Sequence, residues 1–206
     1  MNQVSAIQAS DLACLRGGRM VFRALSFEVG AGKALAIEGP NGAGKSSLLR
    51  LLAGFLAPVS GRVRLSTGEG DVDDAELRGR YVGFLGHQDA AKPQLSVMEQ
   101  LRFYAQLYEI HDSAAAALET VGLSRVAELP CQYLSAGQKK RLSLARLQLT
   151  KRPVWLVDEP LASLDAAGKT LAASLFAKHC ASGGIVIAAT HESLGFDAAR
   201  LLLNAA

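Results

Sequence analysis

The stretch that decides the fold is KALAIEGPNGAGKSSLLRLLAGF, residues 33–55. A short apolar run at 33–39 enters a glycine-rich loop, and apolar residues with helical spacing follow it over 46–55. The loop, GPNGAGKS from Gly39 to Ser46, matches the pattern G-x-x-x-x-G-K-[ST]. A strand, this loop and a helix in succession form the context in which the pattern binds nucleotide phosphates. The alternative, a glycine-rich turn with an incidental lysine, does not account for the flanking elements.

Each residue type in the loop suits phosphate chemistry. Glycines at Gly39, Gly42 and Gly44 would let backbone N–H groups wrap a β-phosphate closely. Lys45 would reach the β- and γ-phosphates, and the Ser46 hydroxyl can bind Mg²⁺. The predicted cradle is Gly39, Pro40, Asn41, Gly42, Ala43, Gly44, Lys45, Ser46 and Ser47.

A second apolar strand, VWLVDE at 154–159, delivers two adjacent acids at its carboxyl end. In parallel α/β sheets ligands bind at that edge. Asp158 is then placed to hold Mg²⁺, directly or through water, and Glu159 to orient and polarise an attacking water. Alone, the pair would be read as a turn-forming aspartate and a surface glutamate. In a chain that also carries a phosphate loop, the pair of acids indicates the second half of a nucleotide site.

Two further polar residues end apolar strands. Gln88 follows YVGFLGH and His191 follows GIVIAAT. At the same sheet edge, either residue could touch the γ-phosphate, its Mg²⁺ or the attacking water. A single histidine at a strand end is usually structural, so His191 gains a functional meaning only from the other motifs.

The stretch YLSAGQKKRLSLARLQL, from Tyr133, predicts a helix with an unusual start. Ser135 and Gln138 have the spacing of a capping box, yet Gly137 sits in the first turn, where glycine costs about 1 kcal/mol relative to alanine. Three cations follow at 139–141, near a helix end that already favours anions. One chain has no need of two γ-phosphate cradles. If two copies pack head to tail, however, Ser135 and Gly137 can meet the γ-phosphate held by the neighbour.

Length, composition and charge limit the folds and functions that the chain can have. The chain has 206 residues, 50% of them hydrophobic, with a net charge of +3, which suits one domain with a substantial core. The charge excess is too small to indicate a nucleic-acid partner, and we expect none. The cysteines lack metal-binding, redox or haem-attachment spacing, which is typical of reduced, buried thiols; they are Cys14, Cys131 and Cys180. No signal peptide and no apolar run of about 18 residues is visible, so a membrane role would depend on another chain.

Alternating strands and helices predict an α/β fold with a parallel sheet covered on both faces. We expect a single domain over 1–206 with a helical subdomain inserted at about 89–136. The expected strands are 20–30, 33–39, 61–67 (at an edge), 80–88, 153–159 and 183–191. The expected helices are 46–55, one from Ser96, one capped by Asp112 or Ser113 and closed by Gly122, one from Ser135, and 166–181. Residues 68–79 are expected to form a surface loop.

Taken together, the motifs resemble those of the nucleotide-binding subunits of ATP-binding-cassette transporters. They are the phosphate loop, Gln88, LSAGQ at 134–138, LVDEP at 156–160, SLD at 163–165 and His191. The resemblance implies a RecA-like P-loop ATPase core with an N-terminal antiparallel β region, ATP and Mg²⁺ as cofactors, and an ATP-bound dimer. It also implies roles for single residues: Glu159 and His191 in catalysis, Gln88 as a metal ligand that senses the membrane subunit, Ser135, Gly137 and Gln138 on ATP, and Asp165 across the dimer.

Two positions depart from that pattern. Ala136 stands where the signature usually has glycine, and alanine is unstrained in a first helical turn. Arg16 stands where an aromatic residue commonly stacks on adenine, and a guanidinium can also stack on a base.

Arg16, GHQ at 86–88, LSAGQKKR and LARLQLT together resemble a narrower group, the CcmA ATPases of bacterial cytochrome c biogenesis. That resemblance implies a membrane-spanning partner of the CcmB type, further partners of the CcmC, CcmD and CcmE types, and a peripheral position on the cytoplasmic face of the inner membrane. The work powered would be haem export or release of a haem-loaded chaperone.

Other functions remain open from sequence. The chain could serve another transport system, or remodel a cytosolic assembly such as a ribosome without transport. A membrane partner would be expected to place a cytoplasmic helix near Ala90 to Gln100. A P-loop kinase or GTPase leaves residues 134–138 unexplained.

Overall fold

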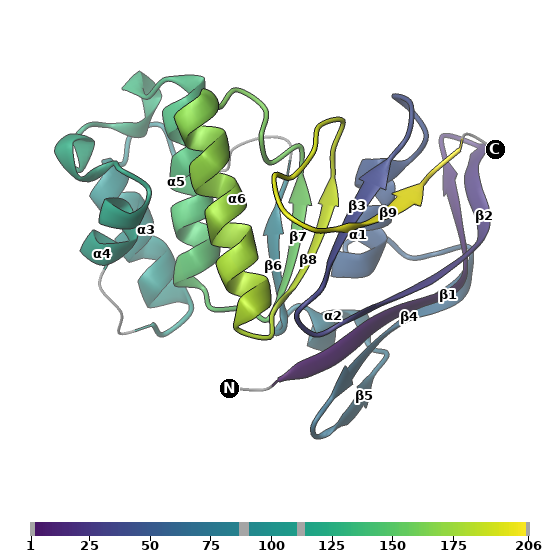
Figure 1. The fold of residues 1–206 in the computed structure, drawn as a ribbon. Helices are drawn as coiled ribbons and strands as arrows, with labels where there is room; N and C mark the ends of the chain where they lie inside the picture. The colour runs from purple at the N-terminus through teal and green to yellow at the C-terminus, as the bar shows by residue number, and fades with distance from the viewer. Residues whose placement is uncertain (1–2, 87–90, 111–113, 205–206) are drawn as a thin grey trace.

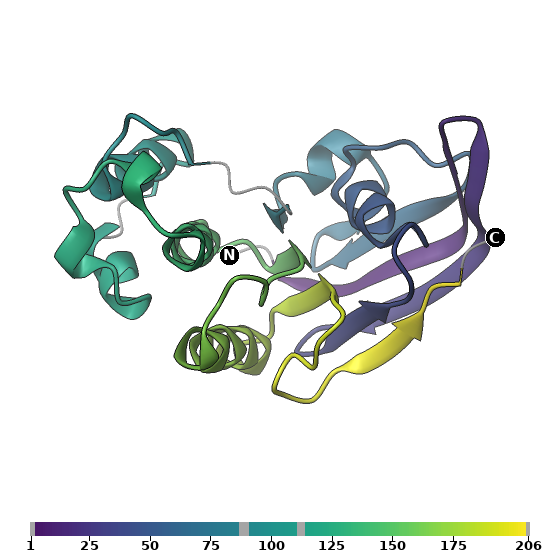
Figure 2. The same ribbon diagram turned by 90° about the horizontal axis from the view of Figure 1, so that it is seen from above.

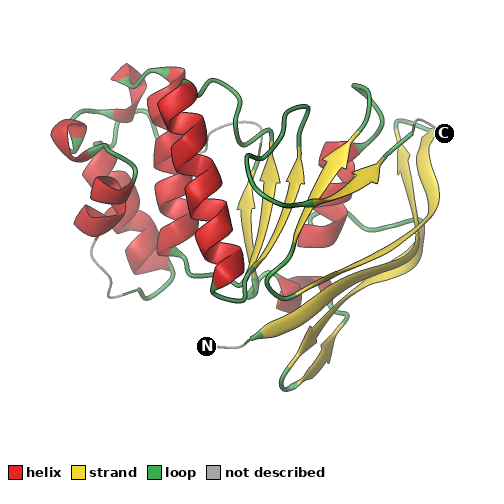
Figure 3. Ribbon diagram, in the orientation of Figure 1, coloured by secondary structure: helices red, strands yellow, loops and turns green. Residues whose placement is uncertain are grey.

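The computed structural model describes residues 3–86, 91–110 and 114–204. It contains two sheets, with most of the helices gathered at one end of the molecule (Figures 1 and 3). The predicted ligand Gln88 and the candidate helix caps Asp112 and Ser113 lie outside the described residues.

The larger sheet is parallel throughout, with the strand order β6-β7-β8-β3-β9. Its strands are β6 (Val82–Leu85), β7 (Val154–Asp158), β8 (Ile185–Ala189), β3 (Ala34–Glu38) and β9 (Ala199–Leu202). Every residue of β7 and β8 is buried, as their uninterrupted apolar runs predict for strands covered on both faces. The predicted α/β class with a parallel core is confirmed. Within this larger sheet, β9 alone was not predicted, because its four residues are mostly exposed and show no alternation of apolar and polar residues.

Successive side chains of the central strands pack into two separate cores, since they point to opposite faces. Val154 and Leu156 join the core made with α1 (Lys45–Ala53) and the second sheet. Trp155 and Val157 join the core made with α5 (Ala136–Leu149) and α6 (Ala166–Ala181). Seen from above, α1 lies on one side of the sheet and α5 and α6 on the other (Figure 2). Both covering layers are thus present, which explains why the strands carry no polar face.

The second sheet is antiparallel, with the order β2-β1-β4-β5. Its strands are β1 (Val4–Arg16), β2 (Arg19–Gly30), β4 (Ser60–Thr67) and β5 (Gly70–Val72). The antiparallel N-terminal region implied by the family resemblance is therefore confirmed. The strand β1 escaped prediction because its pairing shifts register near Asp11, whose φ of 49° breaks the alternation of buried and exposed residues.

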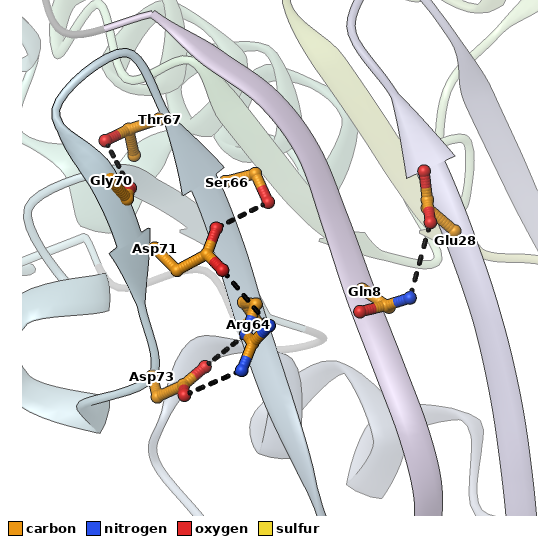
Figure 4. Close-up of polar contacts among 8 residues, drawn as sticks. All are labelled: Gln8, Glu28, Arg64, Ser66, Thr67, Gly70, Asp71 and Asp73. Carbon is orange, nitrogen blue, oxygen red and sulfur yellow. Dashed lines mark hydrogen bonds and ion pairs between the residues drawn. The ribbon is translucent and has the colours of Figure 1, made fainter.

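Two predictions about the end of this sheet were wrong. The strand β4 is internal rather than an edge, because β5 pairs with it. Residues 68–79 are not a plain loop, since they contain β5 and the short helix α2 (Ala75–Arg78), capped by Asp74. On the exposed face, Arg64 binds Asp71 at 3.1 Å and Asp73 at 3.0 Å, and its hydrogen bond lowers the pKa of Asp73 (Figure 4). Polar cross-strand pairs such as these replace the hydrophobic pattern that sequence reading relies on.

Between β6 and α5 the described residues, 91–110 and 114–135, are largely helical. The elements are α3 (Val97–Leu107), α4 (Ala114–Thr120) and two single 3₁₀ turns, Ser124–Val126 and Cys131–Tyr133. The predicted cap Ser96 is confirmed, in a capping box with Glu99, and Gly122 closes α4 with a φ of 70°. We propose that this stretch is the inserted helical subdomain, at about 89–136. Within the described ranges, no helix combines the length and apolar character needed to cross a membrane.

One half-buried histidine, His179, packs α6 against the central sheet. The ring of His179 stacks on Trp155 with centroids 3.8 Å apart, and its Nε2 lies 3.0 Å from the Pro153 carbonyl oxygen. Gly184 packs so closely that an added Cβ would lie 2.2 Å from Nε2. Burial lowers the pKa of His179 from 6.5 to about 4, so the ring is neutral in the folded chain at neutral pH.

This histidine predicts a loss of stability in acid. Between pH 6.5 and about 4 the unfolded chain binds a proton at His179 that the folded chain does not, so the free energy of unfolding falls as the pH falls. Over this pH range the free energy of unfolding would fall by about 3 kcal/mol in total. Urea unfolding across this pH range should give a flatter profile for His179→Gln than for the natural chain. Parallel profiles would show that the histidine does not carry the effect.

Candidate nucleotide-binding site

The strand register brings the predicted site residues to one edge of the parallel sheet. Ala189, at the end of β8, pairs with Ile37 on one side and with Asp158 on the other. The phosphate loop, the two acids and His191 therefore lie at three neighbouring strand ends. With strands about 4.8 Å apart, the loop after β3 and the acids after β7 lie within reach of one ligand.

The glycines of the phosphate loop are required for two different reasons. Gly39 and Gly44 have φ values of 147° and 99°, and an added Cβ would lie 2.2 Å from the Leu203 carbonyl oxygen and from Val21 Cγ1, respectively. Gly42 has nothing within 4 Å of such a Cβ, so its φ of 84° alone favours glycine. Gly44 is also the N-cap of α1 and supplies no side chain. The first N–H groups of α1 are left open to an anion, as a phosphate site requires.

The catalytic candidates converge on Lys45. Its side chain is buried, and Nζ donates to the carbonyl oxygens of Gly39 at 2.8 Å and Pro40 at 3.2 Å. Nζ also lies 3.0 Å from Nε2 of His191. The same Nε2 is 3.0 Å from Asn41 Oδ1 and 3.5 Å from Glu159 Oε1. His191 thus joins the phosphate loop to the acid after β7.

The two acids have different environments. Asp158 is buried at the end of β7. Glu159 is half-buried and has a φ of 46°, in the left-handed region that non-glycine residues seldom adopt. Its N–H donates to the Ala189 carbonyl oxygen at 2.9 Å, which holds the strained residue beside the sheet. Backbone strain of this kind costs about 1–3 kcal/mol and is concentrated at functional sites.

The oxygen donors at this edge suit Mg²⁺. Ser46 offers a hydroxyl in the first turn of α1, and Asp158 offers a carboxylate. Within the described residues no group of three or more His, Cys, Asp or Glu could hold a metal. Magnesium beside a nucleotide commonly uses only one or two protein oxygens, together with phosphate oxygens and water. The donor set therefore fits a nucleotide-bound Mg²⁺ ion.

The predicted helix start at Ser135 is confirmed. Its Oγ accepts from the Gln138 N–H at 3.2 Å, and the Gln138 side chain accepts from the Ser135 N–H at 2.9 Å. Ser135 and Ala136 are exposed, so the helix tip is accessible. The three cations that follow at 139–141 differ in exposure to solvent, since Lys140 is buried and Arg141 is half-buried.

The same helix tip contacts the loop before α6. An added Cβ on Gly137 would lie 2.9 Å from the Ser163 carbonyl oxygen, and Ser163 has a φ of 65°. Arg141 Nη2 lies 3.8 Å from Asp165 Oδ1, which also caps α6 by accepting from the Gly168 N–H at 2.8 Å. Sequence reading missed this packing, since only the fold brings residues 137 and 163 together. Gly137 therefore has a reason to be glycine within one chain.

Arg16 lies at the exposed end of β1, paired with Arg19 across the turn to β2. Two residues earlier, Cys14 lies close enough to the Ser47 side chain, in the first turn of α1, for Ser47 to lower the pKa of the thiol. Burial raises the pKa of all three cysteines, which are free and buried as predicted. The contact of Cys14 with Ser47 places the end of β1 near the phosphate loop.

Comparison with known proteins agrees with this geometry. The family described as ABC transporter matches residues 22–162, which include the phosphate loop, the helix tip and both acids. The chain belongs to the ABC transporter family.

Similar proteins extend the match over nearly the whole length of this ABC ATPase. It is 50% identical to the cytochrome c biogenesis ATP-binding export protein CcmA of Rhodopseudomonas palustris (strain BisB5), over 97% of this chain and 98% of that protein. It is also 50% identical to the protein of the same name in Nitrobacter hamburgensis, over 96% and 98% of the two chains. An ABC transporter ATP-binding protein structure from Pyrococcus furiosus has the same fold, with a TM-score of 0.82 and 22% identity over 97% and 98% of the chains.

The contact between Gly137 and Ser163 yields a test with a matched control. Gly137→Ala should displace the loop at Ser163 and slow ATP turnover by roughly ten- to a hundredfold, although alanine is the better helix former. Ala136→Gly, at the exposed neighbouring position, should leave turnover near that of the natural chain. Phosphate release by the purified variants would measure both. Equal rates in the two variants would contradict the packing argument.

Proposed function

We propose that this ABC ATPase powers a step of cytochrome c biogenesis from the cytoplasmic face of a bacterial inner membrane. The observation that carries the proposal is the 50% identity, along 97% of the chain, to a relative named for that process. The step would be haem export or release of a haem-loaded chaperone. The partners would be a membrane-spanning subunit of the CcmB type and proteins of the CcmC, CcmD and CcmE types.

ATP would be bound between two copies of the chain packed head to tail. One copy would hold the phosphates with residues 39–47, where the N–H groups of α1 are open and Lys45 lies at the centre. The other would present its helix tip to the γ-phosphate, with Ser135 exposed and Gly137 and Gln138 half-buried. Asp165 is exposed and lies next to Arg141 behind that tip, so it would also reach the dimer interface. Arg16 would stack on the adenine.

Hydrolysis would depend on the residues after β7 and β8. Mg²⁺, held by Ser46 and Asp158 with Gln88 as a further ligand, would neutralise charge developing on the phosphates. Glu159 would orient and polarise the attacking water, and its strained backbone would fix the carboxylate. His191 lies within 3.5 Å of Glu159 and 3.0 Å of Lys45, so its ring would couple the position of the acid to the phosphate loop.

A hollow of about 410 Å³ would seat the membrane partner. Three aromatic side chains line it, among them Phe55, which is 67% exposed, and Tyr108, which is 40% exposed; the third is Phe84. Exposed aromatic side chains around a hollow are typical of a site for an apolar partner surface. The partner helix was expected near Ala90 to Gln100. Ala90 lies outside the described residues, and the hollow involves the end of α3 rather than its start.

The proposed dimer predicts a stalled state. Glu159→Gln should bind ATP but release phosphate at least about a hundredfold more slowly, because the amide cannot polarise water as a carboxylate does. ATP-bound dimers should then accumulate and be visible by size-exclusion chromatography. Adding Ser135→Arg to this variant should abolish the dimer while leaving ATP binding to the single chain. A monomer that binds ATP in both variants would contradict the head-to-tail arrangement.

The biogenesis role is tested in a bacterium lacking its own CcmA. Expression of the natural chain with its membrane partner should restore c-type cytochromes, detected by covalent haem staining, whereas Lys45→Ala should not. The control is the amount of each protein in the membrane fraction, which should be equal. Normal cytochromes in a strain of the source organism lacking this chain would overturn the role and favour another transport system.

A further inference from the structure

A second hollow of about 400 Å³ continues the proposed seat of the membrane partner. It lies at the amino ends of the central strands and is lined by residues next to β6, β7 and β8. Thr150 and Arg152 line both hollows, so the two adjoin, and we call the adjoining pair the groove and each hollow one of its ends. The nucleotide site is at the opposite, carboxyl edge of the same sheet. A ligand of this second end is therefore not the nucleotide.

The two ends of the groove differ in chemistry. The first carries the aromatic side chains Phe55, Phe84 and Tyr108, together with one cationic residue of its own, Arg146. The second is lined by three cationic residues, Arg80, Lys151 and Arg152. None of the described residues that line either hollow is an aspartate or a glutamate. Among the described residues, the groove therefore passes from a mainly aromatic end to a mainly positive end.

Arg152 is fixed at the point where the two ends meet. Its guanidinium donates to the Arg80 carbonyl oxygen and lies 5.2 Å from the centre of the Tyr108 ring. The neighbouring side chains Arg80 and Lys151 are exposed, and the Lys151 backbone has a φ of 49°. A charged group held against an aromatic ring loses little side-chain entropy on binding. The positive end is thus partly preorganised for an anionic partner.

We propose that the positive end binds an acidic segment of the membrane partner, adjoining the segment that fills the aromatic end. The inference rests on the proposed function, because it extends the same partner along the same groove. Carboxylates beside Arg80, Lys151 and Arg152 would steer the partner into one orientation and raise its association rate. Because the positive groups are at the rim, the contribution should weaken as salt screens them.

The test is charge reversal at the positive end. The double variant Arg80→Glu and Lys151→Glu should reduce, by at least roughly tenfold, the multi-span subunit that co-purifies with the chain from detergent-solubilised membranes. Arg125→Glu is the control, since Arg125 is exposed but lines neither hollow. Co-purification with the natural chain should also fall between about 50 and about 500 mM sodium chloride. The milder variant Arg80→Gln and Lys151→Gln should give an intermediate loss.

Two measurements separate this inference from the function on which it rests. ATP turnover of each purified variant should stay within about twofold of the natural chain, because the substituted residues lie at the opposite, amino edge of the sheet. Unchanged co-purification of the double variant would overturn the acidic segment and leave the ATPase role intact. Absence of any multi-span subunit with the natural chain would overturn the proposed membrane partnership, and this inference with it.

The partner's side of the contact is tested by rescue. Single Asp→Lys or Glu→Lys changes across the partner's cytoplasmic segments should include one that restores co-purification of the double variant. Sedimentation with vesicles of phosphatidylglycerol and phosphatidylethanolamine distinguishes a lipid headgroup as the anion. Binding to these vesicles that is lost in the double variant, without any rescuing change in the partner, would assign the groove to lipid and overturn the proposal.

Discussion

The backbone pairing of β8 between β3 and β7 positions every group in the nucleotide site. Ala189 receives hydrogen-bonded neighbours on both sides, and the Glu159 N–H bonds its carbonyl oxygen at 2.9 Å. A shift of one residue in this register would turn each strand's side chains to the opposite core. The full burial of β7 and β8 on both faces prevents such a shift. The chemistry at the sheet edge is thus set by packing beneath it.

A second constraint is the packing of the first turn of α5, the helix tip, against the loop before α6. Gly137 packs on Ser163, and Arg141 reaches the Asp165 carboxylate that caps α6. Both elements would face the neighbouring copy in the proposed dimer. Because they touch within one chain, the surface offered to the neighbour is already assembled before dimerisation. Less conformational entropy is therefore lost when the two copies associate.

Much of this site could be predicted from sequence because its residues follow strand ends in short motifs. The loop at 39–46 has a fixed spacing, and the acids at 158–159 follow an apolar run. What escaped prediction depends on contacts between distant residues. The strand β1 hides its alternation behind register shifts, and Arg141 looks like one of three surface cations until the fold brings Asp165 beside it. The role of Gly137 was assigned to a neighbouring copy, although a contact within the chain already requires glycine.

The helix α5 connects the two surfaces proposed to work together. Its first residues form the tip beside Ser163, and its last turn supplies Arg146 and Leu147 to the aromatic end of the groove. Fourteen helical residues span about 21 Å; seven of them are buried, and five of these belong to the hydrophobic core shared with α3, α4 and α6. A close-packed helix resists bending, so α5 moves as one rigid element. The position of α5 that suits a γ-phosphate at its tip must therefore also suit a membrane partner in the groove at its other end. Differential binding at either end would then bias the other, which is the physical requirement for coupling hydrolysis to a partner.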